Sequence, residues 1–252
     1  MQSNMIVFCH YYNEAYMLQW WLKHHYPLFD HGVMIDYGST DNSNMLIRQL
    51  APNWEIRRSR NPVFDIAACD QEVMEFEREF TGWKMVLNTT EFLCIQHKYA
   101  FLHQLNQQGQ FIYRTTGVTM ADPWGVYSDP SPDAPLVKQR YHGIYRYENI
   151  FRDRFIHQYP DGAYGPGRHQ SFHPSESYIP GAYMLHFRFS PWNEEMIRRK
   201  LFIQTRIPQS DKDKGWGAQH FVDRPELERV YYETAAKAED LRNRDDMRWI
   251  FL

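Results

Sequence analysis

Asp36 stands at the end of a short apolar run, directly before the sequence Tyr-Gly-Ser-Thr-Asp. A carboxylate at that place can accept hydrogen bonds from the N–H groups of a nucleobase and from ribose hydroxyls. Residues 38–41 also have the chemistry of a turn and a helix cap, which is the commoner use of such residues. Taken alone, residues 38–41 therefore favour a helix cap. Asp36, at the end of the strand, is our best candidate for a nucleotide contact.

The histidines offer a second kind of chemistry, metal binding, because His169 and His173 are four residues apart. That spacing suits a metal ion when both residues lie on one helix. Glycines and prolines on both sides of the pair argue against a helix, so we expect no zinc site there. His25 follows Trp21 by four residues on a predicted helix, and we expect both rings to pack in the core.

Strand and helix signals alternate through the first half of the chain. Strands that alternate with helices form a largely parallel sheet, whose ligands bind at the carboxyl ends of the strands. These ends fall at residues 9–12, 36–40 and 88–91. The predicted strands are residues 5–8, 33–36, 54–57 and 83–87. One predicted helix begins near Asn13, and two others span residues 42–50 and 65–80.

The second half has a different character. Residues 121–135 hold four prolines and three aspartates, and residues 160–180 are rich in Gly, Pro, His and Ser. Both stretches are predicted to be loops, and long loops in a compact domain are often functional. A strand at 182–189 and helices at 193–205 and 225–242 are predicted around and after them.

Composition excludes several classes of protein. Apolar residues make up 43% of the 252 residues and charged residues 23%, which is typical of a globular domain with a substantial core. The net charge of −3 provides no basic surface for nucleic acid. No apolar stretch reaches the length of a transmembrane helix, and the aromatic tail at 249–252 either contacts a membrane or a partner or, as is commoner, packs on its own domain.

The three cysteines show neither CxxC spacing nor an even number that could pair. A reducing compartment fits that pattern best. The first predicted strand begins at Met5, which leaves no room for a signal peptide. We therefore expect a cytoplasmic protein.

A set of motifs before residue 93 has a regular order and spacing. The motifs are Asn13-Glu14, Leu18, Trp21-Leu22-Lys23-His24-His25, Gly32, Asp36-Tyr37-Gly38-Ser39-Thr40-Asp41, and Trp83 with the apolar run before Asn88-Thr89-Thr90-Glu91-Phe92-Leu93. The set resembles the opening of family 2-like glycosyltransferases. Weaker likeness continues through Arg140-Tyr141, Gly167-Arg168-His169, residues 185–190 and Lys200 to about residue 205.

The resemblance implies a GT-A fold, with a mixed, mostly parallel central sheet flanked by helices and a Rossmann-like nucleotide-binding half. We expect a catalytic domain at residues 1–222, divided into a nucleotide-sugar-binding half (1–95) and an acceptor-side half (96–222), and a C-terminal helical extension at 223–252. The implied activity is transfer of a hexose or related sugar from a nucleotide-diphosphate sugar to a glycan or other hydroxyl acceptor. The expected nucleotide-sugar contacts are Cys9, Tyr11, Asn13, Glu14, Asp36, Ser39, Asp41, Asn88 and Thr90.

One motif departs from the family. The aspartates of the family's Asp-x-Asp motif bind ribose and a divalent cation, but Asn88 and Thr90 stand at those positions here. In one explanation Glu91 binds manganese or magnesium with His169 or His186. In a second, slightly favoured one, arginines, lysines or helix N-termini neutralise the leaving diphosphate without a metal ion. In a third, the protein binds sugars without transferring them.

The resemblance also implies inversion at the anomeric carbon, which needs a base to deprotonate the acceptor hydroxyl. Asp122 and Glu176, each in a predicted long loop, are the candidates. The alternative function is a catalytically silent nucleotide-sugar- or glycan-binding module with the same fold, and the replaced aspartates are its main support. The sequence does not identify the sugar, the nucleotide or the acceptor.

Overall fold

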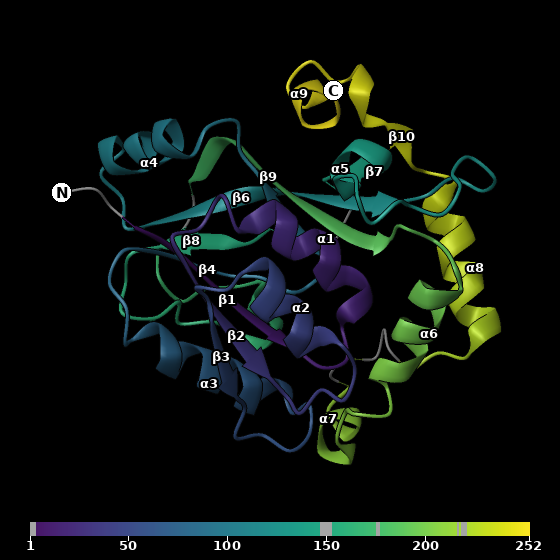
Figure 1. Ribbon diagram of the computed structural model, residues 1–252, viewed down its shortest axis with the longest axis horizontal. Coiled ribbons are helices and arrows are strands. Elements are labelled where there is room, and N and C mark those ends of the chain that lie inside the picture. Colours follow the sequence, from purple (N-terminus) through teal and green to yellow (C-terminus); the bar gives the residue numbers. More distant parts are fainter. Residues whose placement is uncertain (1–3, 147–152, 175–176, 216, 218–220) are drawn as a thin grey trace.

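The computed structural model describes residues 4–146, 153–174, 177–215, 217 and 221–252. Within these ranges, ten strands join in one mixed sheet with helices packed against it (Figure 1). The predicted mixed α/β architecture is confirmed. The strands are β1 (Met5–Tyr11), β2 (His31–Asp36), β3 (Glu55–Arg58), β4 (Trp83–Val86), β5 (Glu91–Cys94), β6 (Ile112–Ala121), β7 (His142–Tyr145), β8 (Phe155–His157), β9 (Tyr178–Phe189) and β10 (Glu239–Asp240).

The described helices are mostly short, and the longest ones flank the sheet. They are α1 (Ala15–His25), α2 (Ser43–Leu50), α3 (Ile66–Glu77), α4 (Lys98–Gln107), α5 (Leu136–Gln139), α6 (Glu194–Ile203), α7 (Gln209–Asp213), α8 (Arg224–Ala235) and α9 (Arg248–Phe251), with 3₁₀ turns η1 (Pro166–Arg168) and η3 (Leu241–Asn243). No helix among the described residues has the length and apolarity to cross a membrane.

The N-terminal half of the sheet is parallel, in the order β4-β1-β2-β3. Alternate residues of β1 face different layers. Met5 and Val7 belong to the core cluster that contains α1 and α2, whereas Ile6 and Phe8 belong to the cluster that contains α3. A strand buried on both faces explains why β1 is a continuous apolar run instead of an alternating one.

Strand order reverses at β1, because the chain continues to β2 and β3 on one side and returns to β4 on the other. The connections on either side therefore leave the carboxyl ends of β1 and β4 in diverging directions. In open α/β sheets this point is where ligands bind. The fold thus predicts a site between residues that follow β1 and residues that follow β4.

The C-terminal half of the sheet is largely antiparallel and was not predicted in detail. β8 pairs antiparallel with both β4 and β6 and so joins the two halves. The long strand β6 pairs with β7, β8 and β9. β5 pairs antiparallel with β9, which sets Glu91 opposite His186.

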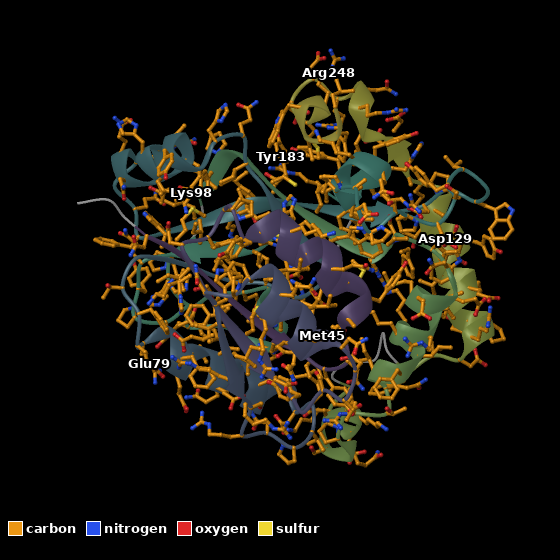
Figure 2. The ribbon with its side chains drawn as sticks, viewed as in Figure 1. Met45, Glu79, Lys98, Asp129, Tyr183 and Arg248 are labelled. Carbon is orange, nitrogen blue, oxygen red and sulfur yellow. The ribbon has the colours of Figure 1, made fainter. Side chains whose placement is uncertain are left out.

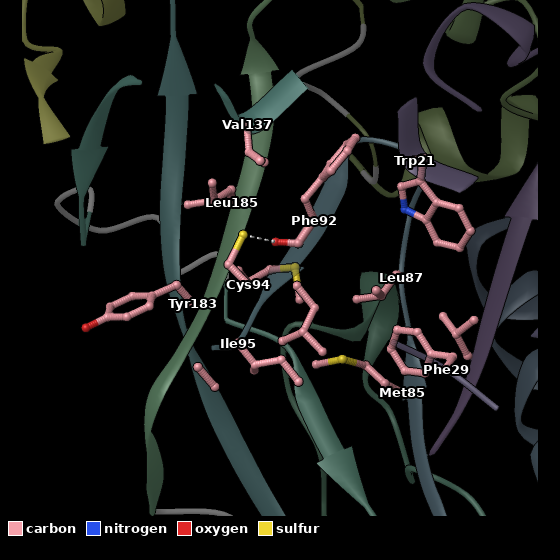
Figure 3. Close-up of a cluster of buried hydrophobic side chains, with 14 of the residues drawn as sticks. Trp21, Phe29, Met85, Leu87, Phe92, Cys94, Ile95, Val137, Tyr183 and Leu185 are labelled. Atoms are coloured by element: carbon pink, nitrogen blue, oxygen red, sulfur yellow. Dashed lines mark hydrogen bonds between the residues drawn. The ribbon is translucent and has the colours of Figure 1, made fainter. Parts of the chain in front are cut away.

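Trp21 and His25 lie in the core, as their helical spacing predicts. Both are fully buried, and the indole Nε1 of Trp21 donates a hydrogen bond of 2.9 Å to the backbone oxygen of Glu91. Figure 3 shows Trp21 beside Phe92 and Leu87 in this cluster, with the thiol of Cys94 directed to the backbone oxygen of Phe92. All three cysteines are buried and free.

The predicted long helix at 225–242 is wrong in its second half. α8 ends at Ala235, and β10 then pairs with β7, which ties the C-terminal region to the sheet. Burial of Leu241 and a hydrogen bond from its backbone N–H to the oxygen of Tyr141 hold this turn in place. The tail packs on its own domain, since Phe251 is buried in the main core cluster. Figure 1 shows α9, which contains this residue, above α5.

Candidate functional site

A cavity of about 360 Å³ opens at the carboxyl ends of β1 and β4, at the point where strand order reverses. We call it the basic cavity. Its described lining comprises His10, Tyr11, Tyr12, Asn13, Glu14, Tyr16, Tyr37, Phe64, Ile66, Cys69, Asp70, Asn88, Thr89, Thr90, Glu91, Arg154, Gly167, Arg168, His169, His186, Phe187, Arg188, Phe189, Arg198, Arg199, Lys200, Phe202, Ile203, Arg206, Val222, Leu227 and Val230.

Aromatic rings form one wall of the basic cavity. The rings of Tyr12 and Phe202 are nearly parallel, at 11° with centroids 5.9 Å apart, and the guanidinium of Arg206 lies 4.0 Å from the Tyr12 centroid. Tyr37 and Phe64 also line the cavity and meet edge to face. Flat, polarizable surfaces of this kind suit a nucleobase.

The basic cavity has a net positive charge, unlike the chain as a whole. Seven basic side chains line it and three acidic ones do, whereas the whole chain carries a net charge of −3. The basic ones are Arg154, Arg168, Arg188, Arg198, Arg199, Lys200 and Arg206. A concave surface with such an excess attracts anions, because low-dielectric walls focus the field of the charges.

Glu91 and Arg154 form a buried ion pair at the base of the cavity. Arg154 Nη2 donates to Glu91 Oε1 over 2.5 Å and Arg154 Nε to Oε2 over 2.8 Å, and both side chains are only 2% exposed. Burial alone would raise the pKa of Glu91, but the charge and hydrogen bonds of Arg154 lower that pKa to about 2. Glu91 is therefore a carboxylate whose two oxygens are already occupied by a guanidinium.

Arg168 places a second buried guanidinium beside the altered motif. Its Nη1 donates to Asp70, and its Nη2 donates to Asn88 Oδ1 over 2.8 Å and lies 3.0 Å from His10 Nε2. Burial, with the nearby charge of Arg168, lowers the pKa of His10 well below its ordinary value. Arg168 has a positive φ of 61°, a conformation that costs a non-glycine residue energy and is held here by these contacts.

Glu14 and Arg199 form the third pair. Glu14 directly precedes α1, and its Oε2 accepts a hydrogen bond of 2.5 Å from Arg199 Nε on α6. Arg199 Nη2 also donates to the hydroxyl of Thr89 over 3.3 Å. The three acidic residues in the described lining are thus each paired with an arginine of the same cavity.

The residues at the altered motif do not fit a divalent cation. Glu91 is bound by Arg154, and the side-chain oxygen of Asn88 accepts from Arg168, so a metal ion there would meet two guanidinium charges. His186 lines the cavity opposite Glu91 in the β5–β9 register. Across the described ranges, no group of three or more His, Cys, Asp and Glu side chains is arranged to bind a metal ion.

The nine expected nucleotide-sugar contacts divide into two sets. Tyr11, Asn13, Glu14, Asn88 and Thr90 line the basic cavity. Cys9, Asp36, Ser39 and Asp41 are absent from its described lining, and burial raises the pKa of the Cys9 thiol well above its ordinary value.

Asp36 has a structural use that its position explains. Its Oδ1 accepts hydrogen bonds from the backbone N–H groups of Gly38 and Ser39, at 3.0 and 2.7 Å, and its Oδ2 accepts from the amide of Asn44. Asp36 therefore holds the turn that follows β2. A direct contact between Asp36 and a nucleotide remains a prediction.

The predicted catalytic carboxylate Asp122 is absent from the described lining of the basic cavity. Asp122 is buried, and its Oδ2 accepts from Arg140 Nε and from the backbone N–H of Trp192, both over 3.0 Å. Burial raises the pKa of Asp122 despite the charge of Arg140. Glu176 lies outside the described residues.

The sequence interpretation missed the roles of the arginines. Arg154 belongs to no recognisable motif. Arg168 belongs to Gly167-Arg168-His169, for which the sequence suggested only a family resemblance. Their partners Glu91 and Asp70 are 63 and 98 residues away in sequence. Pairs at such separations become visible only after the strands are placed side by side.

Comparison with known proteins gives a distant likeness. No family model and no curated protein matches the chain. The structure of S. aureus TarS residues 1–349 matches at 12% identity and a TM-score of 0.34, covering 51% of this chain and 38% of that one. Glucosyl-3-phosphoglycerate synthase from Mycobacterium tuberculosis, in complex with Mn2+, UDP and glucosyl-3-phosphoglycerate, matches at 14% identity and a TM-score of 0.33, covering 46% and 44%.

The chain therefore spans less than half the length of either matched chain. A likeness at such TM-scores carries no argument about the function of this chain. The functional assignment therefore depends on the residues of the basic cavity.

Proposed function

We propose that the chain is a glycosyltransferase of the family 2 type, which binds a nucleotide-diphosphate sugar in the basic cavity. It would transfer a hexose or related sugar to a hydroxyl acceptor. In this proposal, residues 1–95 supply the strand ends that face the donor. Residues 96–222 supply all seven of the basic side chains in the described lining, and α8 of the C-terminal extension adds Leu227 and Val230 to the wall.

One observation carries the proposal. A cavity at the reversal of strand order combines parallel aromatic rings with an excess of four positive charges. A nucleotide-diphosphate sugar has the matching parts: a flat base and two phosphates that carry negative charge. Tyr12 and Phe202 suit the base, Arg206 lies beside the Tyr12 ring, and Arg199 is hydrogen-bonded to Thr89 of the altered motif. We assign these two arginines to the diphosphate.

These residues favour a reaction in which arginines, in place of a metal ion, neutralise the charge of the leaving diphosphate. Guanidinium groups bind phosphate oxygens through paired N–H donors, and they retain their charge at any working pH. Glu91 and Asn88 are bound by arginines and suit a divalent cation poorly. We therefore expect donor binding and transfer without manganese or magnesium.

The reaction is a single displacement with inversion. The acceptor oxygen forms a bond to the anomeric carbon as the bond from that carbon to the diphosphate oxygen breaks, and the electron pair leaves with the diphosphate. The hydroxyl proton passes to the imidazole of His186, which lines the cavity on β9. His186 also lies opposite Glu91 in the β5–β9 register, at the end of β5 that the altered motif opens.

A silent binding module is the second candidate. The pairing of Glu14, Asp70 and Glu91 with arginines favours it, because none of these carboxylates is left to act as a base. A module of this kind would bind the donor in the same cavity and release no nucleotide.

The test is a panel of UDP-, GDP- and dTDP-sugars incubated with the protein in a chelating buffer, with and without hydroxyl acceptors. Release of free nucleotide is measured by chromatography. Nucleotide release by wild type that is lost in His186→Ala supports the transferase. Thermal stabilisation by a donor without any release supports the binding module, and neither stabilisation nor release with any donor would overturn both.

A further inference from the structure

A second cavity, of about 450 Å³, lies beside α6 and α8 and shares no described lining residue with the basic cavity. We call it the aromatic pocket. Figure 2 shows Asp129, one of its residues, at the same side of the molecule as these two helices. Its described lining comprises Trp124, Asp129, Trp192, Asn193, Glu194, Glu195, Ile197, Arg224, Glu228 and Tyr232.

Two exposed rings dominate the aromatic pocket. Trp124 is 72% exposed and Tyr232 is 47% exposed, yet their centroids are only 5.7 Å apart. Behind them, Trp192 stacks on Tyr231 at 3.9 Å and 10°, which gives the exposed pair a rigid support. Large rings left in water at a polar rim are a typical feature of a ligand-binding surface.

Hydrogen-bonding groups form the rim of the aromatic pocket, and its four acidic side chains outnumber its one arginine. Arg224 pairs with both Glu194 and Glu228, and Glu195 pairs with Arg198. Asp129 Oδ1 accepts a hydrogen bond of 2.8 Å from the amide of Asn193. The remaining negative charge disfavours a phosphate or another anion, while the many acceptor oxygens suit a ligand rich in hydroxyls.

A hydrogen bond connects the two cavities. Asn193 Nδ2 donates to Asp129 Oδ1 and to the hydroxyl of Tyr16, each over 2.8 Å. Tyr16 lines the basic cavity and Asn193 lines the aromatic pocket. The two cavities therefore adjoin at Asn193 and Tyr16.

We propose that the aromatic pocket binds a neutral oligosaccharide and so supplies the acceptor subsite; this assignment rests on the proposed transferase function. The faces of Trp124 and Tyr232 pack against the apolar C–H faces of the sugar rings. The carboxylate of Asp129, which the amide of Asn193 holds in place, accepts hydrogen bonds from the sugar hydroxyls. A basic peptide suits the pocket less, because arginine residues of the chain already bind Glu194, Glu195 and Glu228.

The test uses maltotetraose, cellotetraose, xylotetraose and N-acetylated chitotetraose as probes, titrated into the full chain while tryptophan fluorescence and saturation-transfer NMR are recorded. We expect at least one probe to bind wild type, and Trp124→Ala to weaken that binding at least tenfold. The matched control is Tyr99→Ala on α4, since Tyr99 is 67% exposed and lies in neither cavity. This control should bind as wild type does.

Three results would overturn the assignment. They are the absence of binding by all four probes, equal binding by wild type and Trp124→Ala, and displacement of a bound probe by a lysine-rich peptide at lower concentration. Thermal stabilisation by nucleotide sugars is measured on the same samples. Stabilisation without oligosaccharide binding refutes the acceptor subsite alone, whereas absence of stabilisation refutes the proposed donor site, whatever the probes do.

Discussion

The basic cavity and the aromatic pocket share the helix α6 but present opposite chemistry. The first turn of α6 gives Glu194 and Glu195 to the aromatic pocket, and its later residues give Arg198, Arg199 and Lys200 to the basic cavity. Acidic residues at the N-terminus of a helix and basic residues toward its C-terminus are also the arrangement that the helix dipole stabilises. One helix can thus separate two binding surfaces by charge while it gains stability.

The opposite charge of the two cavities would keep a donor and an acceptor apart. An anionic donor is attracted to seven basic side chains, whereas the rim of the aromatic pocket repels it. A neutral acceptor has no such preference and is selected by ring faces and hydroxyl contacts. Three substitutions and a change of pH test the basic cavity's side of this division.

His186→Ala should have the largest effect. Loss of a positioned general base lowers the rate by about 10²–10⁴-fold. Donor affinity should stay within twofold of wild type, because His186 is assigned to the acceptor proton and not to the diphosphate. The control is His103→Ala on the exposed side of α4. Equal rates in His186→Ala and wild type would remove the proposed base, and rescue by added imidazole would support it.

Glu91→Ala should destabilise the fold. The change leaves Arg154 as an uncompensated buried charge, which costs about 3–5 kcal/mol. Urea unfolding without metal ions measures it, and Glu226→Ala on the surface of α8 is the control, with little change expected. An unchanged midpoint in Glu91→Ala would mean that the carboxylate has little structural use and would reopen the metal-binding role.

Arg199→Ala should weaken nucleotide binding. A hydrogen bond to a charged group contributes about 1.5–3 kcal/mol, so the expected loss is at least tenfold. Arg229→Ala is the matched control, because Arg229 is exposed on α8 and outside both cavities. Isothermal titration with nucleoside diphosphates compares the two variants. Equal affinity in Arg199→Ala would place the diphosphate elsewhere in the cavity.

A change of pH should have the smallest effect of the four. The free energy of unfolding should change little near neutral pH and fall as the pH drops below about 4.3. The pKa of Glu91 is about 2 in the folded chain, below the value of about 4.3 in an unfolded one. Its stabilisation is therefore complete above about pH 4.3 and is lost as the pH falls toward 2. Glu91→Gln should reduce the slope of unfolding free energy against pH in this window. An unchanged slope would contradict the assigned ion pair.

The parallel half of the sheet could be predicted from the sequence, whereas in the second half only β9 was predicted, as a strand at 182–189. β1, β2 and β4 are short apolar runs with turn residues at their ends, which is a strong signal. β6 holds buried threonines and a glycine in place of a clear apolar pattern, and β8 has three residues. Such strands exist because their neighbours bury them.

The site was predictable to the level of strand ends and no further. Residues 88–91 lie in the lining of the basic cavity, at the strand end where the sequence placed them, and their lack of aspartates is visible in the sequence. The pairs Glu91–Arg154 and Asp70–Arg168 depend on contacts across the sheet, as does the position of Asp122 against Arg140. Local sequence carries no information about such distant partners.

The most direct measurement of the central claim is isothermal titration of UDP, GDP and dTDP into wild type, in a chelating buffer and again with manganese. We predict that at least one nucleotide binds in the chelating buffer and that manganese changes its affinity less than threefold. Binding that requires manganese would contradict neutralisation by arginine, and no binding under either condition would contradict the assignment of the basic cavity to a nucleotide-diphosphate sugar.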